Sequence, residues 1–102
     1  MRFLVQATMP VEAGNALIRD PNFSKRLDAV LAALKPEAAY FGVQCGQRTM
    51  FLIVDMKETA QLPAIVEPLW LSFQADVKLI PVMDKADMAK ATPAIQQAVK
   101  QF

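Results

Sequence analysis

The side chains able to do chemistry in this chain are few and scattered. The sequence contains no histidine and a single cysteine, Cys45. Histidine is the commonest general base and the commonest transition-metal ligand. Its absence excludes Ser-His and Cys-His nucleophile systems, histidine-ligated haem and the usual zinc sites. We therefore expect no metal and no cofactor, and any proton transfer would have to use carboxylates or a tyrosine.

Three glutamates lie nearest to apolar surroundings in the sequence: Glu12, Glu37 and Glu67. A buried carboxyl group has a raised pKa and can shuttle a proton. The alternative is that all three are solvated carboxylates at helix ends or in loops, which is the commoner situation.

Tyr40, Trp70 and Arg48 are the other candidate ligand contacts. Tyr40 could donate a hydrogen bond to a ligand oxygen, Trp70 could wall a pocket beside Pro68, and Arg48 could bind an anionic substrate. Each has an ordinary alternative: a strand tyrosine at a subunit contact, a helix-packing tryptophan and an exposed arginine next to a turn. The candidate ligand-binding residues are thus Tyr40, Glu67, Trp70 and Arg48, and no catalytic residue is predicted.

Two further features favour structural roles. Cys45 has no cation near it in sequence except Arg48, and no histidine to activate it, so we do not expect a catalytic thiol. Asp84 and Asp87 have the spacing of paired metal ligands, but a helix-capping box explains both.

Composition limits the partners and the compartment. The 102 residues carry 11 Lys and Arg against 10 Asp and Glu. Without a basic run there is no electrostatic footprint of a nucleic-acid binder. The chain shows neither a secretory segment nor a membrane-spanning apolar stretch, and it has one cysteine, so we expect a cytoplasmic protein with one domain over residues 1–102.

Apolar periodicity predicts an α+β fold. Period-two and helical patterns alternate in the order strand, helix, strand, strand, helix, strand, followed by a helical tail. This is the ferredoxin-like βαββαβ arrangement: a four-stranded antiparallel sheet with its main helices on one face. The predicted elements are a strand over 2–9, a broken helical region over 11–34, a hairpin over 35–56 with its turn at Cys45–Arg48, a helix within 56–73, a strand over 75–83, and a tail helix capped at Asp84 with a second start at Thr92–Pro93.

The second face of this sheet is too apolar for water. One parity of strand residues is apolar throughout and suits the helix-covered face. Leaving the large apolar residues of the other parity wet would forgo several kcal/mol, at about 25 cal/mol per Å². We therefore expect a homodimer in which two sheets pack back to back. The contact would include Leu4, Phe51, Ile53, Ile80 and Val82.

The strand "FLIVDM", the helix "KETAQLPAIVEPLWLSF" and the strand "ADVKLIPVM" are similar in order and pattern to the dimeric α+β barrel superfamily, in particular to muconolactone isomerase-like proteins. The likeness covers roughly residues 2 to 83. It implies a homodimer with a pocket between sheet and helices. The superfamily includes isomerases, cofactor-independent oxygenases and many uncharacterised bacterial proteins. The resemblance therefore implies a protein that binds a small, partly apolar metabolite, and a cofactor-independent isomerase or oxygenase is one form that such a protein could take. The alternative is a noncatalytic ligand-binding or oligomerisation module.

Overall fold

The computed structural model describes residues 1–102 and contains four strands and four α-helices. The order of elements is the predicted one, with the first helical region divided in two by a break at Asp20–Asn22. The elements are β1 (Arg2–Thr8), α1 (Val11–Arg19), α2 (Phe23–Leu34), β2 (Ala38–Gln44), β3 (Gln47–Asp55), a short 3-10 turn (Thr59–Gln61), α3 (Leu62–Phe73), β4 (Asp76–Val82) and α4 (Lys85–Gln101).

The strands form one sheet in the order β2-β3-β1-β4, and every neighbouring pair is antiparallel. β1 is central: Val5 lies opposite Leu52 of β3 on one side and opposite Leu79 of β4 on the other. This topology confirms the predicted ferredoxin-like α+β fold. It also places β4 at an edge, which is where a strand containing Pro81 is tolerated.

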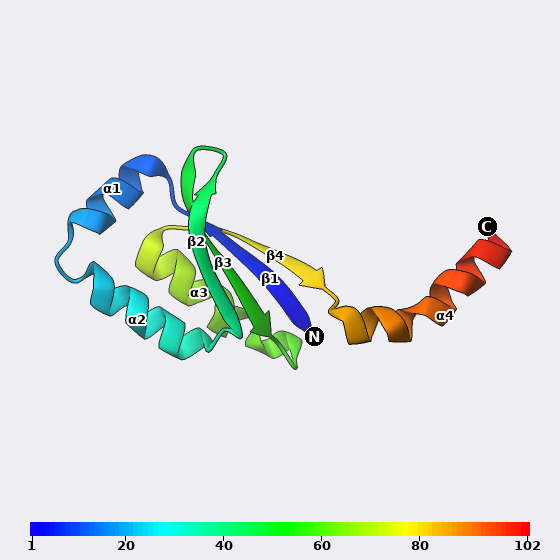
Figure 1. The fold of residues 1–102 in the computed structure, drawn as a ribbon. Coiled ribbons are helices and arrows are strands. Elements are labelled where there is room, and N and C mark those ends of the chain that lie inside the picture. Colours follow the sequence, from blue (N-terminus) through cyan, green and yellow to red (C-terminus); the bar gives the residue numbers. More distant parts are fainter.

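Helices α1, α2 and α3 gather on one side of the sheet (Figure 1). Between them lies the core, whose most completely buried large side chains are Val5, Leu52, Leu69 and Phe73. The Phe73 ring meets Phe23 of α2 edge-on, with the ring centroids 5.9 Å apart. Burying such a side chain contributes about 1.5–3 kcal/mol, so this layer supplies most of the stabilisation of the fold.

The β2–β3 hairpin turn is shorter than predicted. Cys45 and Gly46 both have positive φ angles, 52° and 76°, and they alone connect the strands. Positive φ at both central residues defines the type I′ turn, whose twist suits a two-residue hairpin. The predicted turn at Cys45–Arg48 was therefore too long, and Arg48 belongs to β3, where its parity is that of the buried Met50.

Helix α4 runs without interruption from Lys85 to Gln101 but bends in its middle (Figure 1), and it leaves the body of the molecule. It begins at the predicted capping box, in which Asp84 accepts a hydrogen bond from the Asp87 amide at 2.8 Å. The expected second helix start at Thr92–Pro93 is wrong, because Pro93 lies inside α4. The helix extends away from the sheet to the C-terminus (Figure 1), and none of its residues is buried.

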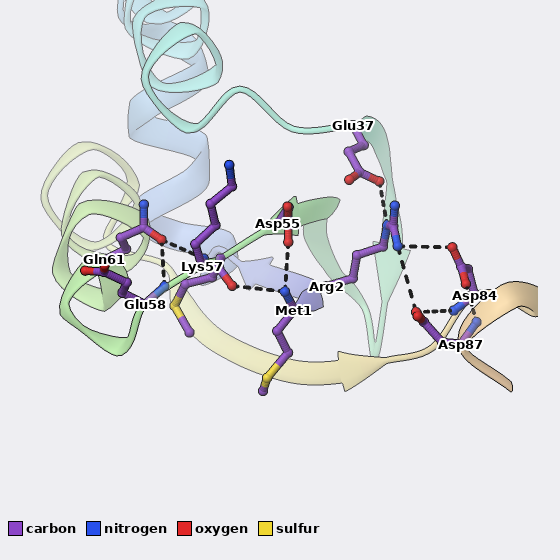
Figure 2. Close-up of polar contacts among 10 residues, drawn as sticks. Met1, Arg2, Glu37, Asp55, Lys57, Glu58, Gln61, Asp84 and Asp87 are labelled. Carbon is purple, nitrogen blue, oxygen red and sulfur yellow. Dashed lines mark hydrogen bonds and ion pairs between the residues drawn. The ribbon is translucent and has the colours of Figure 1, made fainter. Parts of the chain in front are cut away.

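A polar network around Arg2 holds the start of α4 to the sheet (Figure 2). The Arg2 guanidinium donates hydrogen bonds to Glu37, the residue before β2, at 2.9 Å and to Asp84 at 3.1 Å. It also lies 3.8 Å from the Asp87 carboxylate. The bond to Glu37 raises the pKa of Arg2. The hydrogen bond from the Asp87 amide lowers the pKa of Asp84, and the charge of Arg2 lowers it further. Charged contacts thus link the first turn of α4 to β1 and to the residue that precedes β2.

Acid is expected to loosen the first turn of α4. Because the pKa of Asp84 is lower in the folded protein than in the unfolded chain, its capping contribution is present above the unfolded value and is lost as the pH falls through the folded value. NMR of the Ala86 to Met88 amides should show this fraying before the β1 and β3 amides change. Because the charge of Arg2 lowers the pKa of Asp84, Arg2→Gln should move this fraying of α4 to higher pH. A first turn of α4 that stays unchanged throughout the acid titration would contradict the capping role of Asp84.

Candidate functional site

A cavity of about 200 Å³ lies between the sheet and helices α1 and α2. For scale, an engineered protein cavity of about 150 Å³ binds benzene, so the space here suits a ligand of roughly that size. Six of its nine lining residues are hydrophobic. The lining residues are Met9, Ile18, Phe23, Leu27, Phe41, Gly42, Arg48, Thr49 and Met50.

Buried side chains of α3 fill the core on one side of the sheet, whereas the space beneath α1 and α2 is less completely filled and forms the cavity. Towards β2 the sheet continues beyond its helical cover, so that Phe41 of β2 remains 57% exposed and Ile18 of α1 49% exposed although both line the cavity. Phe23 and Leu27 close the α2 side, and both pack against the core. The result is an apolar recess with an apolar mouth, the usual character of a small-molecule site.

Arg48 is the one ionisable residue that lines this cavity. It is half-buried, and its Nη2 donates a hydrogen bond to Asn15 Oδ1 at 3.0 Å. No carboxylate lies within ion-pair distance of it, in contrast to Arg2 and Arg26, which are both paired. A guanidinium has five N–H donors in a fixed fork. Arg48 therefore presents a cation without an acidic partner to an apolar recess.

Gly14 of α1 makes the position of this guanidinium possible. A Cβ atom added at Gly14 would lie 2.8 Å from Arg48 Nη1, closer than real Cβ contacts. The Arg48 backbone is held as well, because its carbonyl accepts a hydrogen bond from the Met9 amide at 2.9 Å. Asn15, on the next position of the same helix, then orients the side chain.

The structure brings only Arg48, of the four candidate ligand-binding residues, to the cavity. Tyr40 lies on the opposite face of the sheet and is 66% exposed. Glu67 and Trp70 are both exposed on α3 and do not line the cavity. The four residues therefore do not form a common site within one chain.

The carboxylates and the cysteine that the sequence singled out all lie outside the cavity. Glu12, Glu37 and Glu67 are all exposed. Glu37 is bound to Arg2, and Asp84 belongs to the capping box of α4. Cys45 is exposed at the tip of the hairpin.

Several residues of the cavity were not singled out from the sequence. Ile18 and Leu27 occupy apolar helical positions that fit a core equally well. One signal was present: Gly14 stands inside a helix, where glycine is unfavourable, and such a glycine often marks a close approach. The sequence alone did not indicate that the side chain packed against Gly14 is that of Arg48.

The fold and the cavity together define a small α+β protein of ferredoxin-like topology with an apolar recess under its helices. Over residues 1–96 the chain matches the family described as a domain of unknown function, DUF3303, and it belongs to that family. Comparison with curated proteins and with solved structures gave no significant match. None of the helices combines the length and apolar character needed to cross a bilayer.

Gly14→Ala should displace the Arg48 guanidinium without destabilising the protein. The new methyl group would push away the end of a flexible side chain. Alanine is more favourable than glycine inside a helix by about 1 kcal/mol. We expect the NMR signal of the Arg48 side-chain N–H groups to shift and the melting temperature to hold or rise.

Gly42→Ala is the matched control, because the nearest atom to its added Cβ would be on Phe51 at an ordinary 3.8 Å. An Arg48 signal that stays in place in Gly14→Ala, or moves equally in both variants, would contradict the described packing.

Proposed function

We propose that this protein is a homodimeric small-molecule-binding protein whose ligand is a small, partly apolar anion held by Arg48. The observation that carries the proposal is Arg48, a half-buried residue that lines an apolar cavity and whose guanidinium is bonded to Asn15 but has no carboxylate partner. A charge in such surroundings is costly unless a counter-charge or hydrogen-bond acceptors accompany it. A ligand carboxylate would supply both.

The shape of the site narrows the chemical class of the ligand. Guanidinium and carboxylate groups form two parallel hydrogen bonds, which fix the orientation of the acid group. The hydrophobic side chains around the rest of the cavity would then hold a body about the size of a six-membered ring. Small aromatic or branched aliphatic carboxylates fit this description.

Binding without catalysis fits the cavity better than a cofactor-independent isomerase or oxygenase. Proton transfer needs an acid or base within hydrogen-bond reach of the substrate. A guanidinium offers hydrogen-bond donors and no acceptor, and Arg48 is the one ionisable residue that lines the cavity. An enzyme acting here would have to take its proton acceptor from the ligand or from a second chain.

Benzoate and its neutral analogue benzyl alcohol provide a direct test. In protein labelled at the methionine methyl groups, benzoate should shift the signals of Met9 and Met50, which line the cavity. Hydrogen bonds to charged groups contribute about 1.5–3 kcal/mol. Arg48→Gln should therefore weaken benzoate binding roughly tenfold to a hundredfold and leave benzyl alcohol binding nearly unchanged.

Arg19→Gln removes an exposed cation of α1 that lies outside the cavity lining, and it should affect neither compound. Absence of any shift at Met9 and Met50 with both compounds would remove this cavity as a ligand site. Benzyl alcohol binding alone would keep the site but refute the role of Arg48.

The homodimer is proposed on the uncovered face of the sheet. One end of this face is apolar except for Arg2 and Asp55 at its outermost row, with Leu4 lying opposite both Ile53 and Ile80. At the other end Thr8 contacts Thr49, and Gln44 and Lys78 line a polar hollow. A second copy packed against the apolar end would cover side chains that are half-buried or exposed in one chain. These are Leu4, Tyr40, Phe51, Ile53, Ile80 and Val82.

Ile53→Lys should abolish this contact, because it places a charge in the middle of the apolar end. We expect monomer, or aggregate, by sedimentation equilibrium, with the amide spectrum of the helix-covered core retained in any monomer. Gln44→Lys introduces the same charge at the polar end and should leave the subunit count unchanged. A dimer of undiminished affinity in Ile53→Lys would refute the assigned interface.

A cytoplasmic location is part of the same proposal. Cys45 is exposed and unpaired, a state that is stable in a reducing compartment. Its position at the tip of a hairpin gives it no partner within the chain.

A further inference from the structure

Gly14 and Asn15 are consecutive residues in the middle of α1, and both lie against Arg48. The Arg48 Nη2 donates a hydrogen bond to Asn15 Oδ1 at 3.0 Å, and Nη1 lies where a Cβ atom at Gly14 would meet it at 2.8 Å. Glycine and asparagine are both less favourable than alanine inside a helix. Two such residues side by side in a helix of nine residues indicate that this turn of α1 accommodates Arg48 at the expense of helix propensity.

The chemistry of the two side chains determines the orientation of the Asn15 carboxamide. A guanidinium has donors and no acceptor, so the carboxamide atom that faces it is the oxygen. The NH₂ group of Asn15 is therefore turned away from Arg48. Asparagine thus anchors the guanidinium through an acceptor without placing a negative charge beside it.

Two other arginines of the chain are anchored by carboxylates. Arg2 bonds to Glu37 at 2.9 Å, and Arg26 bonds to Asp20 at 3.2 Å. The acceptor for Arg48 lies at a similar distance, 3.0 Å, but it is neutral. Arg48 is therefore held in place like the paired arginines and keeps its net positive charge.

The anchored guanidinium still has donors for a ligand. One of its five N–H groups goes to Asn15, and a carboxylate needs two of the others. The backbone of Arg48 is fixed too, because its carbonyl accepts a hydrogen bond from the Met9 amide at 2.9 Å. A cation that is already in position loses little conformational freedom when a ligand binds.

We infer that Asn15 is a positioning residue that makes the cavity selective for anions, because it anchors Arg48 and leaves the charge of the guanidinium to the ligand. The inference rests on the proposed function and assigns the choice of ligand charge to a residue outside the cavity lining. Aspartate at this position would have two effects of the same sign. One carboxylate oxygen would pair with Arg48, and the other would replace the outward NH₂ group with a negative charge that repels an anion.

Asn15→Asp tests this selection, because it changes the charge of the side chain with almost no change in its size. With the methyl signals of Met9 and Met50 as the readout, benzoate binding should weaken at least about tenfold, as expected for loss of a hydrogen-bonded charge partner. Binding of benzyl alcohol should be nearly unchanged. Asn22→Asp is the matched control: it makes the same change at an exposed residue outside the cavity lining, and it should affect neither compound.

The outcomes separate this inference from the proposed function. Undiminished benzoate binding in Asn15→Asp would overturn the inference and leave the proposed function intact. Equal weakening of benzoate and benzyl alcohol would assign Asn15 a purely structural role and overturn it as well. Failure of the unmodified protein to bind benzoate would overturn the proposed function itself, and the inference with it.

Asn15→Leu distinguishes an effect through Arg48 from a direct contact with the ligand. Leucine is close to asparagine in size and more favourable in a helix, and it removes the acceptor without adding a charge. Benzoate affinity should fall severalfold when Arg48 is present and stay the same in the Arg48→Gln background. An equal loss in both backgrounds would contradict a role through Arg48. The near-UV signal of Trp70, which lies on α3, checks that the fold is unchanged.

Discussion

The burial of the inward face of β1 is the interaction on which the rest of the structure depends. β1 is paired on both sides, and the inward side chains of Val5 and Ala7 are fully buried. Leu69 and Phe73 of α3 are fully buried in the same core cluster. Because the register of a strand decides which side chains face the core, fixing β1 also fixes β3 and β4. The helix-covered face and the uncovered face are then set for the whole sheet.

The cavity and the projecting helix α4 are both consequences of where this core ends. Towards β2 the strand continues beyond α1 and α2, which leaves a recess beneath their residues Ile18 and Leu27. Beyond β4 the chain has no further strand to pair with, so α4 leaves the sheet, and Arg2 links its first turn to β1. The filled part of the core thus supplies stability, while the incompletely covered part beneath α1 and α2 supplies the cavity proposed for binding.

The fold could be predicted from the sequence because each element is indicated by several residues and not by one. Each strand and helix carries several apolar residues at the right period, so an error at one position changes little. The break near Asp20, the hairpin and the Asp84 cap each have a local cause in residue type. The helix-facing parity of Val5, Leu52 and Val54 follows from the same alternation and is confirmed.

The site could not be predicted in this way, because it depends on single positions. Arg48 lines the cavity because the hairpin turn uses only Cys45 and Gly46. Assigning two more residues to the turn placed Arg48 outside the strand and hid its parity. Tyr40 and Trp70 are aromatic residues suited to a pocket, but strand alternation already puts Tyr40 on the face away from the helices, and α3 leaves Trp70 exposed. Residue type alone carried no information about either placement.

Native mass spectrometry of protein purified gently from its host reports both the subunit count and any retained small molecule in one spectrum. We expect a dimer, part of it carrying the mass of a small organic acid, and loss of that mass in Arg48→Gln. A monomer at every concentration, with no added mass, would contradict both the uncovered sheet face as a contact between copies and the cavity as a binding site.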